Sequence, residues 1–482
     1  MTYANFLQKY FVLWYIFCTF APKKVKTLLG GSRFSRVNGR TLRAYFCTFA
    51  AQMKKIGLIL FGIGICIGAF AQTHTRVWGE QIRTLRVERR VLMLEDGVVD
   101  GSDPENTLHI SFDEMSHDVH FYTYTVRLMN KPNPDPSLEG REEVSSLLSS
   151  EYLQGFTTRD ITDYEHSINT SREYTHYWFD FPNEDMAITK SGNYRLTIYE
   201  DGNPDKRVAE VDFCVVEPLV KIDAKVRANT DIEFNGRYQQ VDVDVNLQNT
   251  AINYQPSEFS VLVTQNNRTD NAVMMTQPTF VEPNRLRYIN SKALIFEGGN
   301  EYHHFDAFSC FYAGYGIDRV FHEMGDYHVS LLPNEITQGQ YIHEFDSDGR
   351  FVVNAERTND SDTEAEYMWV YWTLPAEKPF FDGALYLGGE LFNNELTLRN
   401  RMQYDAEAKC YWLTALVKQG GYDYQYWFVP KSQEVQQKTT TQRVDGSYWQ
   451  TENEYAVYVW WRPFGARYDR LVGVQIIRSN AL

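Results

Sequence analysis

The stretch Val241-Asp-Val-Asp-Val-Asn-Leu247 shows most directly how this chain folds. An apolar residue alternates with a polar residue along it, which is typical of a β-strand with one buried face. The runs Phe121–Leu128 and Gly192–Tyr199 have the same strand character, and turn-forming pairs such as Asn235-Gly236 separate such runs. The sequence therefore predicts an all-β protein built from antiparallel sheets.

The number of strand signals predicts immunoglobulin-like β-sandwiches in series. The chain has 482 residues, and a sandwich of this type holds roughly 100 to 150. We expect an N-terminal sandwich at residues 72–218, a middle one at 219–360 and a C-terminal one at 361–482. The first boundary follows Glu217-Pro218, and the second lies in the acidic stretch Thr358–Glu366, which we interpret as a polar loop.

Helical patterning is scarce in this sequence. The one candidate is Glu142–Leu153, which follows the turn-rich stretch Asn130–Pro136. We predict a helix there and strands over most of the remaining chain.

The segment Met53–Ala71 has the order of a secretory signal peptide. Two lysines are followed by an apolar run that ends in Ala69-Phe70-Ala71, a small-x-small cleavage site. Cleavage between Ala71 and Gln72 would export the rest of the chain. Residues 1–52 then precede a signal that acts at an N-terminus, so we interpret them as a mis-annotated extension, with a translated basic arm as the alternative.

The charge balance excludes one large class of partners. The formal net charge is −16, and removing residues 1–71 removes ten basic and no acidic residues, which leaves −26. So acidic a protein repels the phosphate backbone, and nucleic-acid binding is therefore not expected.

The cysteines predict neither a disulfide framework nor a zinc site. Cys214, Cys310 and Cys410 remain after residue 71, and they lie about a hundred residues apart. We interpret them as buried single thiols.

Two histidine motifs resemble metal sites without having the required spacing. His322 and His328 are six residues apart with Gly325-Asp326 between them, whereas a helical zinc motif needs four, so we predict a turn between two strands. The neighbours His303 and His304 would point to opposite faces of a strand.

The acidic motifs also have simpler interpretations. Asp346-Ser-Asp-Gly349 lacks the downstream glutamate of a calcium loop and is predicted to be a β-turn. No nucleophile elbow, phosphate loop or dinucleotide motif is found in the sequence. We therefore predict a non-enzymatic protein without catalytic residues, cofactor or metal.

The last strand region, Glu454–Pro463, is apolar on both faces. One of its faces carries Tyr458, Trp460 and Arg462. A strand with two apolar faces is covered on both sides, either by another part of the chain or by a partner protein. We keep both possibilities, and the three residues are our candidates for partner contact.

Several separated motifs, in the right order, carry a resemblance to a known family. They are Tyr164–Thr170, Tyr174–Tyr177, Phe181–Asn183, Ser191–Tyr194, Gly383–Asn394, Met402–Asp405, Tyr411–Tyr426, Gly446–Tyr455 and Arg462–Gly473. Over essentially Trp78–Ser479 the chain resembles the plug proteins of the type IX secretion system.

The resemblance implies a non-catalytic periplasmic protein on the inner side of the outer membrane. Proteins of this family bind the translocon barrel, called SprA or Sov, and occlude its periplasmic opening when no cargo is in transit. The resemblance implies no small-molecule substrate and no cofactor, and it assigns no barrel contact to a position in this sequence.

An alternative function is polysaccharide binding at the outer membrane. The C-terminal segment also resembles glycogen-binding immunoglobulin-like domains, which stack sugars on a tryptophan after Phe-Asn-x. Here Phe392-Asn393-Asn394 is followed by Glu395, so the stacking residue is missing there. Trp412 and Trp427 are the residues whose substitution would test this alternative.

Overall fold

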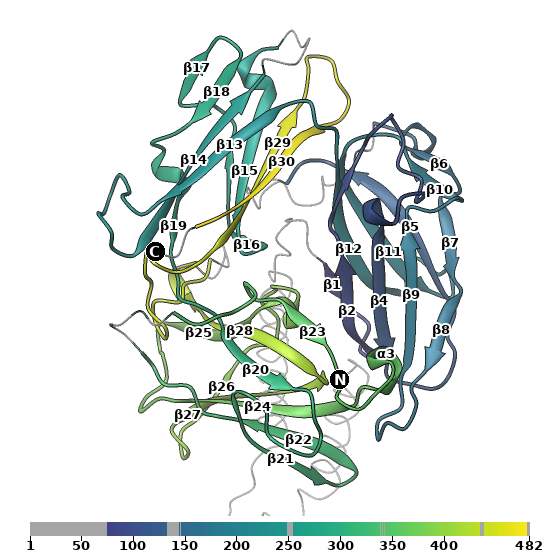
Figure 1. The fold of residues 1–482 in the computed structure, drawn as a ribbon, viewed down its shortest axis with the longest axis vertical. Coiled ribbons are helices and arrows are strands. Elements are labelled where there is room, and N and C mark those ends of the chain that lie inside the picture. Colours follow the sequence, from purple (N-terminus) through teal and green to yellow (C-terminus); the bar gives the residue numbers. More distant parts are fainter. Residues whose placement is uncertain are drawn as a thin grey trace, which may run out of the picture. The chain divides into compact units, whose positions relative to one another are not determined.

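The computed structural model describes residues 75–132, 144, 146–247, 254–337, 339, 341, 343–433 and 438–479. All of them belong to one compact unit. The predicted signal peptide, its cleavage position between Ala71 and Gln72, and residues 1–52 lie outside the described part. The fold is all-β, as predicted, and its strands form three sandwiches (Figure 1).

The first sandwich consists of two sheets with a common apolar core. In order of neighbouring strands, the larger sheet contains β1 (Arg76–Val77), β12 (Arg207–Val216), β11 (Gly192–Glu200), β5 (Tyr122–Met129) and β7 (Thr158–Ile161), with β3 (Val91–Met93) parallel to β12. The smaller sheet contains β2 (Ile82–Glu88), β4 (Leu108–Glu114), β9 (Thr175–Phe181) and β8 (Asp163–His166). A ribbon of β6 (Leu153–Gly155) and β10 (Met186–Ile188) lies beside them.

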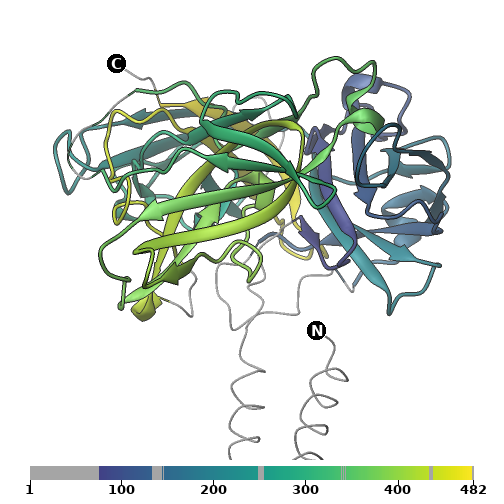
Figure 2. The same cartoon turned by 90° about the horizontal axis from the view of Figure 1, so that it is seen from below.

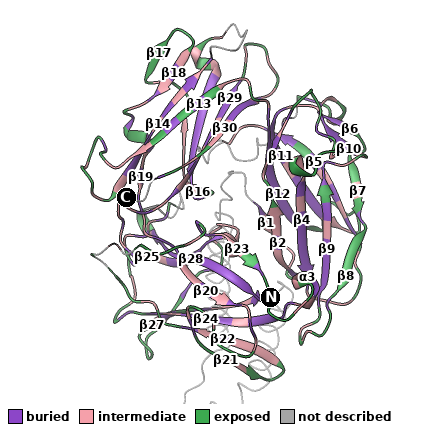
Figure 3. Cartoon of the chain, in the orientation of Figure 1, coloured by how far each residue is buried: buried purple, intermediate pink, exposed green. Residues whose placement is uncertain are grey.

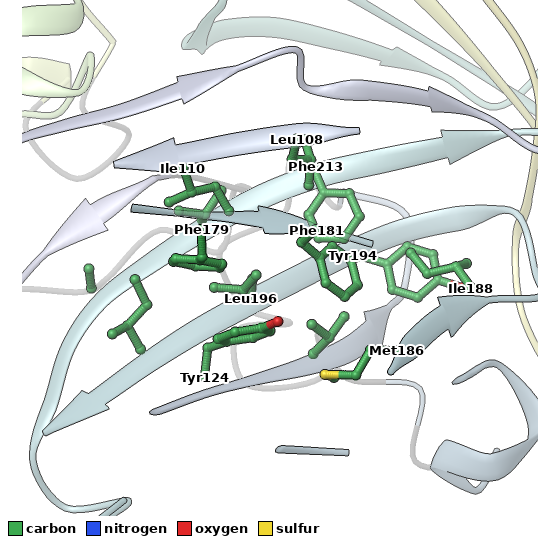
Figure 4. Close-up of a cluster of buried hydrophobic side chains, with 14 of the residues drawn as sticks. Leu108, Ile110, Tyr124, Phe179, Phe181, Met186, Ile188, Tyr194, Leu196 and Phe213 are labelled. Atoms are coloured by element: carbon green, nitrogen blue, oxygen red, sulfur yellow. The ribbon is translucent and has the colours of Figure 1, made fainter. Parts of the chain in front are cut away.

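Alternate residues of the central strands form the core of this sandwich (Figure 4). Tyr194 and Leu196 on β11 point inward, and neither is accessible to solvent. Aromatic rings pair across the core, with Tyr124 stacked on Phe179 at a centroid distance of 4.5 Å. Pairs of this kind stabilise a core beyond the area they bury.

The second sandwich is closed by the last hairpin of the chain. One sheet contains β13 (Lys221–Arg227), β14 (Tyr238–Asn246), β18 (Arg285–Tyr288) and β17 (Phe280–Glu282), with β19 (Ile295–Glu297) also paired to β14. The other contains β16 (Arg268–Met275), β15 (Phe259–Gln265), β29 (Glu454–Trp461) and β30 (Arg470–Arg478). The strand predicted from the alternation in Val241–Leu247 is confirmed, since Val241, Val243 and Val245 of β14 are fully buried in this core.

The third sandwich is formed by the strands between these two parts of the second. Its first group contains β20 (His303–Ala307), β28 (Gly420–Pro430), β23 (Phe351–Val353) and β25 (Gly383–Gly388). Its second contains β21 (Ile317–Glu323), β22 (Asp326–Leu331), β24 (Tyr367–Pro375), β27 (Cys410–Lys418) and β26 (Gln403–Asp405). Figure 3 shows β28 buried along almost its whole length, whereas the edge strand β8 of the first sandwich is exposed.

The sheets therefore do not follow the expected boundary near residue 360. β20 to β23 precede that boundary but share the core of the third sandwich with β24 to β28. β29 and β30 follow it but pair with β15 of the second sandwich. The change of sheet between β12 and β13, in contrast, falls at residues 217–220, next to Glu217-Pro218.

Two local predictions were wrong. In the described part of Glu142–Leu153 the chain forms a 3-10 turn at Ser149–Glu151 and the start of β6, where Thr189 donates to the Glu151 carbonyl. The stretch Thr358–Glu366, expected to be a polar loop, contains the short helix α3 (Ser361–Glu364). The Asp360 side chain caps it by accepting from the Asp362 amide, a helix start that the sequence analysis overlooked.

Candidate interaction surfaces

α3 contacts the first sandwich, and this contact explains why Thr358–Glu366 is acidic. The helix lies beside the blue strands of that sandwich in two perpendicular views (Figure 1, Figure 2). Arg86 of β2 is 2.5 Å from the Asp362 carboxylate, and the buried Glu366 accepts from the Ser171 amide at 2.6 Å. The acidic residues are partners for the first sandwich.

A buried ion pair lies beside α3. Lys418 of β27 and Asp113 of β4 are each about 1% exposed, and Lys418 Nζ is 2.6 Å from Asp113 Oδ2. Tyr367 donates to the same oxygen at 2.7 Å, and His176 Nδ1 is 2.6 Å from the other. Burial alone would raise the pKa of the Asp113 carboxyl, but Lys418 and His176 outweigh it and hold that pKa below its ordinary value. Burial also lowers the pKa of Lys418.

The first and second sandwiches meet through an apolar cluster. Trp460 of β29 is 1% exposed and packs with Cys214 and Val216 of β12, and Tyr458 lies partly buried against the same cluster. Of the two covers considered for this face of Glu454–Pro463, the structure therefore shows the intramolecular one. Trp460 is therefore covered within the chain and Tyr458 is partly buried beside it, and of the three candidate contact residues only Arg462 has an exposed side chain.

The second and third sandwiches meet along the outer face of β28. Trp427 is fully buried there, with the Arg268 guanidinium 4.5 Å from its ring centroid. Nearby, Arg350 Nη2 is 2.6 Å from Glu454 Oε1. Because Trp427 is inaccessible, it cannot offer a stacking platform to a sugar. Each sandwich thus contacts both of the others through named side chains.

The third sandwich carries an exposed aromatic loop, residues 308–316, between β20 and β21. Phe311, Tyr312 and Tyr315 are 77%, 48% and 61% exposed. The loop is nevertheless well anchored, since the Asp306 amide donates to the Tyr315 carbonyl at 3.0 Å and the Tyr312 hydroxyl donates to the Glu356 carboxylate. Exposed aromatic side chains at fixed positions are typical of protein-binding surfaces.

The sequence contained a signal for this loop that we did not use. Phe308-Ser-Cys-Phe-Tyr-Ala-Gly-Tyr-Gly316 places two glycines among aromatic residues between two strand runs. A Cβ on Gly314 would lie 2.1 Å from the Asp306 carbonyl oxygen, so glycine is required for the loop to fold back on β20.

The histidine motifs form structural contacts. β21 and β22 form a hairpin that turns at Met324 and Gly325, both at positive φ, which confirms the predicted turn between His322 and His328. The His304 ring lies 2.6 Å from Asp423, and hydrogen bonding to that carboxylate raises the pKa of His304 to about 9. Among the described residues, no cluster of three or more histidine, cysteine or acidic side chains is arranged to hold a metal ion.

Asp346–Gly349 forms the predicted turn, with Asp348 and Gly349 at positive φ. Asp348 is buried beside Asp346 and Glu454. Burial, followed by the charge of Asp346, raises the pKa of Asp348 to about 7. The pKa of the Asp348 carboxyl is therefore raised, whereas that of the Asp113 carboxyl is lowered.

The three cysteines are unpaired. Cys214 is buried, as predicted, whereas Cys310 and Cys410 are partly exposed. Burial raises the pKa of both the Cys214 and Cys310 thiols to about 12, so these two groups are not reactive thiolates near neutral pH.

Fold and surfaces together define an all-β protein of three sandwiches with an anchored, exposed aromatic loop. A family model described as Type 9 secretion system plug protein 1st domain matches residues 82–217, the segment that forms the first sandwich. The chain belongs to the type 9 secretion system plug protein family, and it is thus a secretion component.

The chain is also similar to a solved structure. It is a hypothetical protein from Parabacteroides merdae ATCC 43184, with 37% sequence identity, a TM-score of 0.78, and coverage of 85% of this chain and 100% of that chain. A biofilm-associated protein BSP domain also aligns over 85% of this chain and 61% of its own length, but at 6% identity and a TM-score of 0.17 it carries no argument. No curated protein matches the chain.

No helix in the part of the chain that the structure describes has the length and apolarity needed to span a bilayer.

Proposed function

We propose that this protein is a periplasmic plug. It binds the outer-membrane translocon barrel of the type IX secretion system, SprA or Sov, and occludes the periplasmic opening while no cargo is in transit. The observation that carries the proposal is the match of the first sandwich to the plug family. A plug needs a folded body large enough to block an opening, and three sandwiches joined by buried contacts supply one without a cofactor.

The predicted signal peptide supports the periplasmic location. Export after Ala71 delivers the chain to the compartment where the periplasmic mouth of the barrel lies. The plug then alternates between bound and released states, and cargo shifts the population toward release by competing for the same opening.

The aromatic loop 308–316 is the proposed contact with the barrel. Phe311 and Tyr315 are large, exposed and held on an anchored loop, which suits residues that contribute most to binding. Arg462 is a second candidate because its side chain is half exposed.

Co-purification with a tagged barrel tests the proposal. We expect the wild-type protein to co-purify and deletion of its gene to make the outer membrane leak large antibiotics. The double substitution Phe311→Ser and Tyr315→Ser should reduce recovery on the barrel without lowering Tm, since both side chains are exposed. Phe381→Ser is the matched control, because Phe381 is 74% exposed elsewhere on the third sandwich. Loss of co-purification in the control, or no association of the wild type, contradicts the proposal.

Polysaccharide binding is the second candidate function, and one observation favours it. Trp412 of β27 is 39% exposed and lines a cavity, whereas Trp427 is buried. Retention of the protein on immobilised glucan, abolished by Trp412→Ala and kept by Trp427→Phe, would establish this function. Absence of retention leaves plugging as the sole proposal.

A further inference from the structure

A cavity of about 530 Å³ lies between β2 of the first sandwich and β27 of the third. This volume is within the range of pockets that hold ligands. Its lining includes Arg83, Thr84, Trp369, Arg399, Arg401 and Trp412.

A strained bulge in β2 carries Arg83 into this lining. The register between β2 and β4 shifts between Arg83 and Arg86, and Thr84 has φ of 48°. A β-branched residue rarely adopts this conformation, and bulges re-aim side chains. The Thr84 hydroxyl lies 2.6 Å from the Tyr367 hydroxyl of the third sandwich, which holds the bulge at the cavity wall.

Three guanidinium groups gather at the cavity, and in the described part of the chain none of them forms a close ion pair with a carboxylate. Arg83 donates through Nη1 to the carbonyls of Glu80 and Ile82 at 2.7 and 2.8 Å. The Arg399 guanidinium donates to the Gly79 carbonyl at 3.4 Å. Among the described residues, no ion pair involves Arg83, Arg399 or Arg401.

The other charged groups at this cavity already have partners. Lys418 pairs with Asp113, and Arg172 pairs with Asp326 at 2.6 Å. The lining carboxylate Glu390 accepts from Asn267 Nδ2 at 3.2 Å. Two further carboxylates act on the cluster from a greater distance. The charge of the exposed Glu80 partly opposes the lowering of the Arg83 pKa, and Arg399 interacts electrostatically with Glu395, which is paired with Arg76 at 2.8 Å.

Arg83 and Arg399 lie close enough to destabilise each other. Burial lowers the pKa of the Arg83 guanidinium, and the like charge of Arg399 lowers it further. In a chain of net charge −16, a cluster of three arginines facing a cavity is an exception. An anion bound between the guanidinium groups would remove this repulsion and satisfy their free donors.

The apolar residues of the cavity lining favour some anionic ligands over others. The cavity is also lined by apolar side chains, namely Leu391, Phe392, Leu398 and Trp412. Leu398 is 83% exposed. Apolar side chains next to guanidinium groups suit a ligand with both a carboxylate and apolar groups, which a peptide offers and inorganic phosphate does not.

We propose that this cavity binds an acidic peptide segment of a partner protein, with a side-chain carboxylate held by Arg83 and Arg399 and a neighbouring apolar side chain against Trp412. The carboxylate accepts hydrogen bonds from the two guanidinium forks, and Arg401 adds positive charge. This site is independent of the plugging role and of the aromatic loop.

Titration of the exported chain with two blocked peptides tests the site. Ac-Glu-Leu-Glu-Leu-NH2 should quench tryptophan fluorescence saturably, whereas Ac-Gln-Leu-Gln-Leu-NH2, which has the same shape without charge, should not. Arg399→Gln should weaken binding of the acidic peptide by about tenfold or more. Arg399 is exposed, so the variant should keep the wild-type Tm.

Arg319→Gln is the matched control, since it removes the same charge from the distant β21. It should bind the acidic peptide as the wild type does. A Trp412→Phe variant should keep binding, measured by calorimetry, but lose most of the fluorescence change. Equal affinity for the glutamine peptide, no saturable binding at millimolar peptide, or displacement of the peptide by equimolar inorganic phosphate would each overturn the proposal.

Discussion

The first sandwich meets its two neighbours in different ways. Against the second it buries Trp460 in an apolar cluster, whereas against the third it buries the charged pair Lys418–Asp113. Apolar contact is non-directional and tolerates small shifts, but a buried ion pair is favourable only in one geometry. We infer that the apolar contact with the second sandwich contributes mainly to stability. The ion pair with the third sandwich fixes how these two sandwiches fit together.

Disrupting the apolar contact between the first and second sandwiches should cause the largest loss of stability. Trp460→Ala removes a fully buried indole and should lower the free energy of unfolding by about 3–5 kcal/mol. Urea denaturation followed by far-UV circular dichroism measures this loss. Arg462→Ala, directly after the same strand and half exposed, is the control and should shift the midpoint far less, since it removes only a 3.6 Å contact with Asp469. A Trp460→Ala protein of normal stability would mean that a partner, and not β12, covers this face.

Breaking the charged interface should cost slightly less and should be partly reversible. Lys418→Met leaves Asp113 buried without its cation and should cost about 3 kcal/mol. Adding Asp113→Asn removes the unpaired charge, so the double variant should recover part of the loss in the same urea experiment. If the two losses simply add, the pair is not coupled in the way its 2.6 Å separation implies.

The comparison also shows which features the sequence could predict. Alternation within β14 and the Asn235-Gly236 turn are local signals, and they predicted strands correctly. The pairing of β15 with β29 joins Phe259 to Trp461, about two hundred residues along the chain, and no local pattern specifies it. The sequence showed that both faces of β29 are apolar. It could not show which part of the molecule covers them, because the covering strands are distant along the chain.

The candidate sites also differ in whether local sequence could predict them. The aromatic loop is continuous in sequence and could have been proposed from its glycines and aromatic residues. Arg83 and Arg399 come from different sandwiches, so only the fold brings them together. Thr358–Glu366 was misread because its acidic residues resemble a solvated loop until their partner Arg86 is placed beside them.

Asp348, unlike Asp113, is a buried carboxyl without a close cation. Its side chain is 7% exposed, and Arg478 Nη2 is 3.7 Å from it, compared with 2.6 Å between Lys418 and Asp113. The pKa of Asp348 is about 7 in the folded protein, above the unfolded value near 3.9. Its folded state holds the proton more tightly, so stability from this group is fully present below pH of about 4 and is lost as pH rises to about 7.

Asp348→Asn should remove this dependence on pH. We expect the variant to gain on the order of 1–2 kcal/mol over the wild type at pH 8 and little at pH 4. The measurement is the difference in Tm between variant and wild type across that range. A difference that is constant with pH would show that Asp348 titrates with its ordinary pKa.

The smallest loss of stability is expected just before the start of β27, where another lysine–carboxylate pair lies at the surface. Lys409 Nζ is 2.7 Å from the Glu377 carboxylate, a separation like that of Lys418 from Asp113, but both side chains are more than half exposed. Water and salt screen such a pair, so Lys409→Met should leave the urea midpoint within error of the wild type. Lys418→Met makes the identical substitution nine residues later, at the end of β27. If both variants lost equal stability, burial would not be what distinguishes the two pairs, and the role assigned to the charged interface would be wrong.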